Sequence, residues 1–437
     1  MAIRSFLCYF LVFLFWHLNE LRVYGAKEVI NHLNASPPPV SKCSASPHGF
    51  AGGSQGLRVT YKGGPCSPLG NPRQILILDQ SRVDSINSFN SKTYVLSDLK
   101  ATNLDSSIKG SPLDAGVFFV QVGFGTPQQN FDLLLDTGSN TTWVQSKPCS
   151  TCKNGNKIFH PSASSTFSNH SCIIPPGESH YKIYYGDHSY SEGYYGCDTI
   201  TMSRTLVYPN FRFGCGQNPN EKFSGASGVL GLTSDGDAMK SFGKIFCYCL
   251  PPKEHSQGYL HFERDAQSKC RTDKSIRLLA KRYYFVNLIG ISVGHIRLEI
   301  SSSFPSHPST IIDSGTVITR LPSSIYTQLS SSFNKFMSQY PPAKAVETLD
   351  TCYNLEGFKN PTIPQVVLHF ENSNDITLDT DTVLYKGDED TVFCLAFAAK
   401  GKQSDLNIIG SHQQRKLNIL YDLQNGKLGF GMGNCNH

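Results

Sequence analysis

Two short segments of this chain, residues 136–139 (DTGS) and 313–316 (DSGT), repeat the same pattern of an Asp, a hydroxyl residue, a Gly and a second hydroxyl residue. Each follows an apolar run, which predicts a buried strand that delivers the Asp to a tight turn. Apolar-apolar-Gly triplets follow in both halves, at 229–231 and 408–410, with their Gly 95 and 97 residues after the Asp. This order indicates an internal duplication. Two related lobes would place the carboxylates of Asp136 and Asp313 face to face.

Length and charge limit the classes of protein that this chain can be. Its 437 residues can hold a targeting segment and two lobes of about 150 residues each. Only 17% of the residues are charged, and Gly, Tyr and Phe are abundant, which favours a β-rich secreted protein. The net charge of +5 comes from the first 113 residues, because residues 114–437 hold 28 Lys and Arg against 28 Asp and Glu. No basic stripe with interleaved aromatic residues appears there, which argues against nucleic-acid binding.

The N-terminus has the pattern of a signal peptide, which we place at residues 1–25. Arg4 precedes an apolar run at residues 6–18, and a small-residue cleavage site follows at 23–25. A membrane anchor is the alternative, but a run of about 13 residues is shorter than the roughly 20 needed to span a bilayer. The other end carries no lipid-anchor tail and no retention signal. The sequence therefore predicts export, with no membrane association after cleavage.

Fourteen cysteines in an exported chain indicate a framework of disulfides. Three lie in the first 113 residues, and the remaining 11 are an odd number, so at least one thiol is free or intermolecular. Cys149, Cys152 and Cys172 could suggest a zinc site, but there is no fourth ligand at the usual spacing. We therefore expect disulfides and no metal.

Organisation along the chain changes near residue 116. Before it, residues 75–89 (ILILDQSRVDSINSF) carry apolar residues at helical spacing, and we expect the Arg and Asp residues on the opposite face. After it, short strand signals recur, and residues 323–340 predict one helix between prolines. The polar stretch 264–281 is the expected boundary between lobes. The predicted strands are 117–122, 131–135, 142–145, 182–185, 199–202, 210–213, 417–421 and 427–430.

Several motifs make this chain resemble the pepsin-like aspartic proteases of plants, in their atypical nepenthesin-like group. Residues 64–69 (GPCSPL) and 79–86 (DQSRVDSI) resemble that group's pro-segment, although Gly64 stands where His is common. The resemblance runs from Leu57 to Cys435. The matching stretches, in order, are 213–216 (FGCG), 248–251 (YCLP), 290–294 (GISVG), 313–322 (DSGTVITRLP), 349–353 (LDTCY), 394–397 (CLAF) and 407–410 (NIIG).

The resemblance implies a mainly β, bilobal pepsin-like fold, with two pseudo-twofold-related β lobes and the active site in the cleft between them. We assign residues 1–25 to the signal peptide, 26–113 to the pro-segment, 114–275 to the N-terminal lobe and 276–437 to the C-terminal lobe. The basic pro-segment suits an acidic cleft, because Lys and Arg pair with carboxylates at neutral pH and lose them in acid. A disordered linker is the alternative interpretation of this region.

Two carboxyl groups that share one proton can hydrolyse a peptide bond without a cofactor. One activates a water as general base while the protonated one donates to the carbonyl oxygen, and the pair titrates as a unit. We assign Asp136 and Asp313 as the catalytic dyad. The supporting residues are Gly138 and Gly315 in the turns, Thr137 and Ser314, which in the family bond across the pseudo-twofold, and Ser139 and Thr316, which would bond the outer carboxylate oxygens.

Residues 185–189 (YGDHS) resemble the flap, a hairpin that closes over substrate. By that match Tyr185 is the flap tyrosine and Trp143, seven residues after Asp136, is its hydrogen-bonding partner. His188 stands where the family often has Gly. It is either an ordinary exposed residue or a cationic contact in acid, since His titrates near pH 6.5.

The cysteines depart further from the family pattern. Ser146 occupies a position where relatives usually have Cys, and Cys197, Cys247 and Cys270 have no counterpart. By analogy with the C-terminal-lobe disulfide of the family we pair Cys352 with Cys394, and leave the other pairings open. Glycosylation sequons begin at Asn34 and Asn169.

These observations predict a secreted aspartic endopeptidase that is made as an inactive precursor and acts on protein or peptide substrates at acidic pH. The expected location is the apoplast, with the vacuole as an alternative. We expect a monomer, although the odd cysteine leaves a covalent dimer open. The competing hypothesis is a non-catalytic binder on the same fold, such as an inhibitor of glycoside hydrolases. A peptide-binding signalling component is a third.

Overall fold

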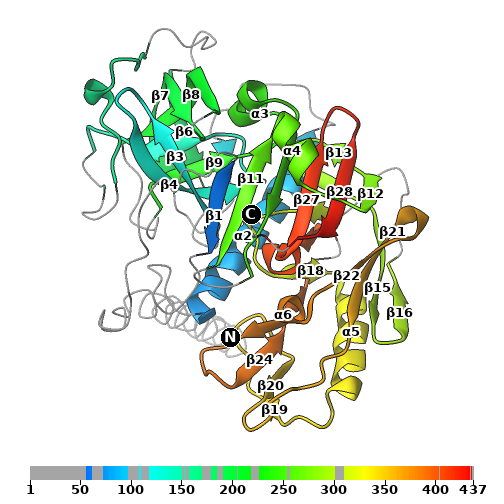
Figure 1. Ribbon diagram of the computed structural model, residues 1–437. Coiled ribbons are helices and arrows are strands. Elements are labelled where there is room, and N and C mark those ends of the chain that lie inside the picture. The colour runs from blue at the N-terminus through cyan, green and yellow to red at the C-terminus, as the bar shows by residue number, and fades with distance from the viewer. Residues whose placement is uncertain are drawn as a thin grey trace, which may run out of the picture. The chain divides into compact units, whose positions relative to one another are not determined.

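The structure is a computed structural model, and all the residues it describes belong to one compact unit, residues 45–437. They are residues 56–61, 72–96, 108–109, 118–149, 152, 157–169, 179–184, 190–203, 205–217, 226–252, 256–300, 310–402, 404–433 and 435. The expected signal peptide, Asn34 and the flap residues 185–189 lie outside them. The described part is mainly β, as predicted (Figure 1).

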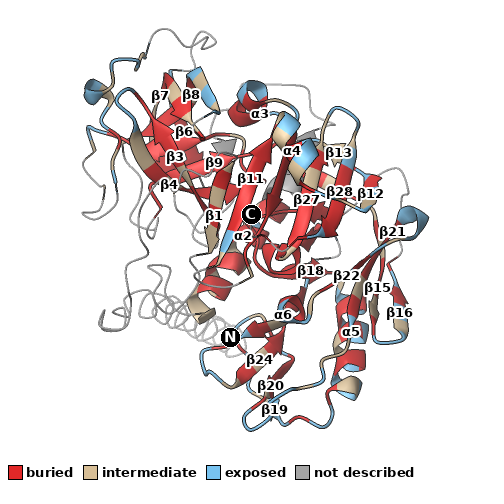
Figure 2. Ribbon diagram, in the orientation of Figure 1, coloured by how far each residue is buried: buried red, intermediate tan, exposed pale blue. Residues whose placement is uncertain are grey.

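A four-strand motif surrounds the first Asp-Thr-Gly turn. Strand β4 (Gln129–Asp136) runs parallel to β9 (Gly228–Gly231), so that Asp136 lies opposite Gly231. Strand β5 (Trp143–Gln145) pairs antiparallel with β9 and parallel with β8 (Val207–Gly216). The turn that follows Asp136 is thereby held between the ends of paired, buried strands (Figure 2).

The same motif recurs in the C-terminal half. Strand β17 (Thr310–Ile312), which delivers Asp313, runs parallel to β26 (Asn407–Ile409). Strand β18 (Thr319–Leu321) pairs antiparallel with β26 and parallel with β25 (Phe397–Ala399). Strand for strand this repeats the first half, so the predicted internal duplication is confirmed in the pairing of the strands.

The remaining strands extend these two cores into sheets, and short helices connect them. The 14-stranded sheet has the order β12 (Lys274–Arg277), β28 (Lys427–Met432), β27 (Leu417–Asp422), β10 (Ile245–Cys249), β11 (Gln257–Phe262), β1 (Leu57–Tyr61), β3 (Phe118–Phe124), β4, β9, β5, β8, β7 (Tyr190–Thr201), β6 (His180–Tyr184) and β2 (Ile108–Lys109). The six-stranded sheet adds β13 (Leu279–Ala280) and β14 (Tyr284–Val286) beside β17. Two four-stranded sheets are β16 (Ile296–Glu299), β15 (Leu288–Val293), β21 (Val366–Phe370), β22 (Asn374–Thr377), and β19 (Pro342–Ala343), β20 (Cys352–Asn354), β24 (Val392–Leu395), β23 (Leu384–Lys386). The helices are α2 (Pro72–Leu96), α3 (Asp237–Phe242), α4 (Glu263–Lys269), α5 (Ser323–Phe336), α6 (Thr380–Val383) and α7 (Ser411–Gln414), with 3-10 turns at Pro161–Ala163 and Glu371–Ser373.

The stretch 264–281, where we expect the boundary between the lobes, holds most of helix α4 and strand β12, and β12 pairs with β28 at the edge of the large sheet. One predicted helix boundary needs correction. Helix α5 ends at Phe336, earlier than the predicted residue 340.

The segment before residue 97 is joined to the rest by a strand and a helix. Strand β1 lies between β3 and β11 and pairs antiparallel with both (Figure 1). Helix α2 confirms the helix expected over residues 75–89 and buries its apolar side chains Ile75, Leu78, Val83 and Ile86. An amphipathic stripe of this kind gains stability mainly from tertiary packing.

One expectation about this helix is wrong. Asp84 is exposed as predicted, but Asp79 and Arg82 lie on the buried face, with exposed fractions of 0% and 1%. Their positions explain this placement, because residues 75, 79, 82 and 86 follow one another at i+3 and i+4 along the same stripe. Two charges within an apolar stripe require partners in the body of the protein.

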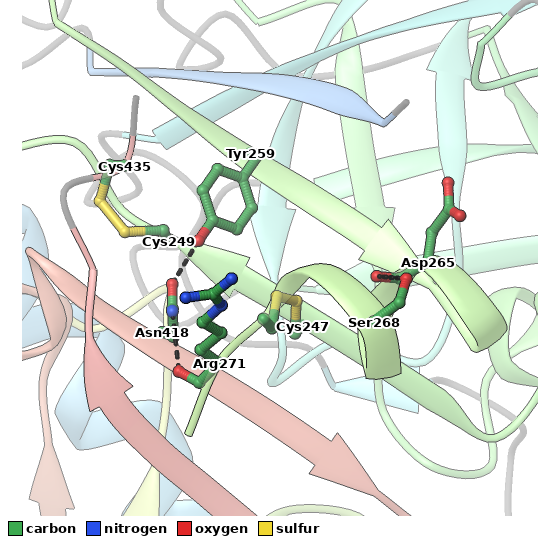
Figure 3. The surroundings of a disulfide bond; sticks show 9 residues. Cys247, Cys249, Tyr259, Asp265, Ser268, Arg271, Asn418 and Cys435 are labelled. Carbon is green, nitrogen blue, oxygen red and sulfur yellow. Dashed lines mark hydrogen bonds between the residues drawn. A yellow bond between two sulfur atoms is a disulfide. The ribbon is translucent and has the colours of Figure 1, made fainter. Parts of the chain in front are cut away.

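Disulfides fasten the region around β10. Cys247 pairs with Cys270 after helix α4, and Cys249 pairs with Cys435 near the C-terminus (Figure 3). Beside them the hydroxyl of Tyr259 donates to the side-chain oxygen of Asn418, whose amide donates to the carbonyl of Arg271 at 2.9 Å (Figure 3). Cys247 and Cys270, two of the three cysteines without family counterparts, thus join strand β10 to the end of helix α4.

The odd thiol is Cys215 on β8, the free cysteine among the described residues, and it is fully buried. Strand pairing places it beside β5, next to Ser146. Burial raises the pKa of the Cys215 thiol to about 12, against a smaller opposing effect of the nearby hydroxyls of Ser146 and Tyr194. The thiol is therefore neutral and enclosed, which disfavours the covalent dimer left open by the cysteine count.

We expect Cys215 to resist alkylation in the native protein, because the thiolate is the reactive form and this thiol is both protonated and buried. Iodoacetamide treatment at pH 8, followed by peptide mass spectrometry, should label the peptide that contains Cys215 only after unfolding in guanidinium. Cys352, which is in a disulfide, provides the control that stays unlabelled until reduction. Rapid labelling of Cys215 in the folded protein would contradict the buried placement.

Candidate active site

The two turns of the duplicated motif meet at one buried site. Asp136 is the last residue of β4, and Asp313 follows β17 directly; each side chain is about 1% exposed. A carboxylate that is removed from water needs hydrogen bonds and a compensating charge. The structure supplies both, from the turns themselves and from helix α2.

In the first half the turn donates to its own carboxylate. The amide of Gly138 donates to Oδ1 of Asp136 at 2.8 Å, and the hydroxyl of Ser139 donates to Oδ2. Both bonds favour the ionised form and fix the direction of the carboxylate.

The second half repeats these bonds. The hydroxyl of Thr316 donates to Oδ2 of Asp313 at 2.6 Å, and the amide of Gly315 approaches Oδ1 at 3.3 Å. Gly315 is also required sterically, because a Cβ at that position would lie 2.3 Å from the guanidinium of Arg82. Any side chain at this position would collide with Arg82 where it binds the two carboxylates.

The two turns are hydrogen-bonded to each other through the residues after each Asp. The amide of Thr137 donates to the hydroxyl of Ser314 at 3.0 Å, and the amide of Ser314 donates to the hydroxyl of Thr137 at 2.9 Å. The Ser314 hydroxyl donates in turn to the carbonyl of Leu135 at 3.0 Å. This reciprocal pair holds the two carboxylates in one fixed arrangement.

Arg82 of helix α2 lies between the two carboxylates. Its Nη2 atom donates to Oδ1 of Asp136 at 2.6 Å and to Oδ1 of Asp313 at 2.9 Å, while its Nε donates to Oδ2 of Asp313 at 2.9 Å. We call these contacts the Arg82 bridge. One nitrogen of Arg82 thus lies within hydrogen-bonding distance of both carboxylates.

The bridge sets the protonation of the site. Burial raises the pKa of Asp136, but the charge and hydrogen bonds of Arg82 outweigh burial and hold that pKa below its ordinary value. Burial likewise acts to lower the pKa of Arg82, yet the two carboxylates raise it above normal. The guanidinium therefore stays charged and Asp136 ionised at any pH near neutral.

A second buried pair lies three residues earlier on the same helix. The Asp79 carboxylate accepts from the backbone amides of Val317 and Ile318, at 2.5 and 3.2 Å, and from Nη2 of Arg320 at 2.9 Å. Both side chains of the ion pair are 0% exposed. Burial raises the pKa of Asp79 in spite of the opposing charge of Arg320.

Sequence reasoning missed Asp79, Arg82 and Arg320 as functional residues. The available signal was helical spacing. Residues 79 and 82 lie on the apolar stripe of the predicted helix, although we expected its charged residues to face water. Arg320 gave no such signal, because a lone Arg in a strand is ordinarily a surface residue.

The other predicted residues have varied outcomes. Trp143 is buried in β5, while its expected partner Tyr185, and His188, lie outside the described residues.

The predicted pairing of Cys352 with Cys394 is confirmed by a disulfide. Cys149 pairs with Cys152, so the zinc alternative is wrong for these two; no group of metal-ligating side chains occurs among the residues the structure covers. Asn169 is exposed.

We expect the loss of Arg82 alone to destabilise the folded chain near neutral pH. Arg82→Gln leaves two adjacent buried carboxylates without a cation, and removal of one partner of a buried pair costs about 3 kcal/mol or more. Urea unfolding of the full-length protein at pH 7 measures this free energy. The pKa of Asp136 is lowered in the folded state, so the stabilisation is complete above the ordinary carboxyl pKa and disappears as the pH falls through the lowered value.

Arg73 provides the matched control on the same helix. Its side chain is 40% exposed and pairs with Glu347 and Asp388 at 2.9 Å each. Exposed pairs contribute about 1 kcal/mol or less, so Arg73→Gln should have a small effect. Equal losses in the two variants would contradict the importance of the buried bridge.

Comparison with known proteins places this geometry in a family. A family model described as xylanase inhibitor N-terminal matches residues 118–262, and one described as xylanase inhibitor C-terminal matches residues 283–432. An aspartyl protease family protein of Arabidopsis thaliana is 37% identical over 91% of each chain. Nepenthesin-2 of Nepenthes gracilis, an aspartic proteinase, is 30% identical over 73% of this chain and 78% of its own.

A solved structure confirms the fold. Conglutin gamma, a basic 7S globulin from lupine seeds, superposes with a TM-score of 0.56 at 17% identity, and the match covers 74% of this chain and 93% of that one. This likeness concerns the mainly β, two-lobed architecture alone. Together with the family models and the curated relatives it shows that the chain belongs to the plant pepsin-like aspartic proteases, in their nepenthesin-like group.

Proposed function

We propose that this chain is the precursor of a secreted aspartic endopeptidase that hydrolyses peptide bonds at acidic pH through Asp136 and Asp313. The observation that carries the proposal is that both carboxylates lie within hydrogen-bonding distance of one nitrogen of Arg82. Two carboxylates this close share a proton once the cation leaves, because like charges cannot both ionise cheaply.

The proposed mechanism needs no cofactor. With Arg82 gone, a water takes its place between the carboxylates; the ionised Asp removes a proton from the water, and the protonated Asp donates to the carbonyl oxygen of the substrate. The orientation of each carboxylate is fixed by hydrogen bonds from its own turn. The donors are Gly138 and Ser139 for Asp136, and Gly315 and Thr316 for Asp313. The reciprocal hydrogen bonds between Thr137 and Ser314 hold the two turns together.

In this proposal residues 26–113 are the pro-segment, residues 114–275 and 276–437 are the lobes, and the substrate is an extended protein or peptide. Two contacts support an inhibitory pro-segment: the Arg82 bridge fills the site, and β1 is paired on both edges within the large sheet. Acid favours release, since protonated carboxylates no longer attract Arg82.

The proposed location is extracellular, in the apoplast, with the vacuole as the alternative. It rests on the signal-peptide pattern of residues 1–25 and on the number of disulfides. Among the described residues, no helix is both long and apolar enough to cross a bilayer. A buried odd thiol, Cys215, is compatible with a monomer.

An inhibitor of glycoside hydrolases is the second candidate, and the observation in its favour is the description of both matching family models as xylanase inhibitor. Against it stand the complete hydrogen-bond sets around both carboxylates, which a pure binding protein has no need to keep. Activity decides between the two candidates.

The first experiment is to express the precursor in a secretory host, acidify it, and measure cleavage of a denatured protein from pH 2 to 7. We expect cleavage in acid that is abolished by pepstatin and by Asp136→Asn or Asp313→Asn. Asp390→Asn, an exposed carboxylate on the loop before β24, should cleave as the wild type does. A folded, processed protein that cleaves nothing would favour the inhibitor candidate, and xylanase inhibition would then be measured.

The pH at which activity appears should depend on Arg82. Its charge lowers the pKa of Asp136, so the inhibited state persists until the pH falls below the ordinary carboxyl pKa. Arg82→Gln removes this effect and should move the midpoint of activation upward by about one pH unit or more. Arg73→Gln should leave the midpoint unchanged. An unchanged midpoint in Arg82→Gln would show that another contact controls release.

A further inference from the structure

The site that holds Asp79 is built from three donors of the C-terminal half. They are the backbone amides of Val317 and Ile318 and the guanidinium of Arg320, at 2.5, 3.2 and 2.9 Å from the carboxylate oxygens. The only group that comes from elsewhere is the acceptor, which belongs to α2. Asp79 and Arg320 are both completely buried, so no water compensates either charge.

We propose that these three donors form a carboxylate-binding subsite of the mature enzyme, which takes an acidic side chain of the substrate after α2 has left. The inference rests on the proposed function and specifies its substrate class. The site is already organised for an anion, since two adjacent amides and an arginine converge on one carboxylate group.

The state of Arg320 after release supports this proposal. Its Nη2 atom donates to Asp79 at 2.9 Å and to Oε1 of Gln80 at 3.2 Å, and both acceptors belong to α2. Its Nε and Nη1 atoms have no hydrogen-bond partner among the described residues. Departure of α2 therefore removes both of these acceptors from a cation held in a buried strand. A guanidinium that has lost both acceptors attracts an anion, which favours replacement of Asp79 by another carboxylate.

The subsite also lies next to the dyad. Val317 directly follows Thr316, whose hydroxyl bonds to Asp313. Arg320 follows Asp313 by seven residues, as Trp143 follows Asp136, and the repeated motif gives the two residues equivalent positions: Trp143 pairs with Val229 and Arg320 with Ile408. A peptide whose scissile bond lies at the dyad can therefore reach the subsite with a nearby side chain.

The pro-segment shows what such a ligand looks like. Asp79 and Arg82 are one helical turn apart, so a single chain fills the dyad with a cation and the subsite with an anion at the same time. A substrate needs only the second of these groups, because its peptide bond and a water replace Arg82 at the dyad.

The test uses the acid-activated wild-type enzyme and fluorogenic peptides that differ only by Asp or Asn, at each of three positions on either side of the scissile bond. At about pH 5 the Asp side chains are ionised. At one position we expect kcat/KM to be about tenfold or more higher for Asp than for Asn, mainly through KM, as for a hydrogen-bonded charge.

Enzyme variants assign this preference to the subsite. Arg320→Gln should reduce the Asp-to-Asn ratio to about two or less while an apolar peptide is still cleaved, and Arg320→Lys should restore part of it. Arg297→Gln, an exposed arginine on β16, should keep the full preference. An intact preference in Arg320→Gln would overturn the proposal.

If the Arg320 variants fail to fold, the wild-type enzyme still decides. A synthetic peptide of residues 72–89 should inhibit it, and the same peptide with Asp79→Asn should inhibit about tenfold more weakly. Cleavage of apolar peptides without an Asp preference at any position, and equal inhibition by the two peptides, would overturn the subsite and leave the endopeptidase intact. Failure to cleave any peptide would overturn both proposals.

Discussion

The central constraint of this structure is the position of one guanidinium between two carboxylates that the fold forces together. The duplicated strand motif delivers Asp136 and Asp313 to the same point, and the hydrogen bonds between Thr137 and Ser314 prevent them from moving apart. Two buried negative charges at this separation repel each other strongly unless they take up a proton or a cation. Helix α2 supplies the cation, and its docking depends on this need.

The same dependence makes the docked state sensitive to acid. A buried ion pair contributes little net stability compared with an apolar contact of the same volume, because desolvation offsets most of the attraction. It differs from an apolar contact in that protons compete with it. Apolar residues such as Val83 and Ile86 hold α2 at every pH, whereas Arg82 holds it only while the carboxylates are ionised. Helix α2 is therefore held by apolar contacts that do not depend on pH and by ion pairs that acid breaks.

The sequence predicted the repeated core well, because strong local signals and a long-range repeat agreed: the apolar runs, the two Asp-containing turns and the later triplets all occupy equivalent strands. It predicted helix α2 from periodicity but assigned Asp79 and Arg82 to the wrong face. Charged residues ordinarily face water, and only the distant carboxylates and Arg320 reverse that preference. The strand pairing within residues 264–281 was not foreseen for a related reason, since the pairing of β12 with β28 is a tertiary contact that local composition does not reveal.

The two halves share a backbone arrangement but not a chemistry. Trp143 and Arg320 occupy equivalent positions seven residues after the two aspartates, one apolar and one cationic. A symmetrical site would treat both sides of a bound peptide alike, whereas this one offers an anion site on one side only. Helix α2 satisfies that asymmetry with Asp79, which pairs with Arg320. Any ligand that displaces helix α2 must either satisfy the same donors or leave them without those acceptors, so in our proposal the contacts that hold α2 also define the ligand that the freed site prefers.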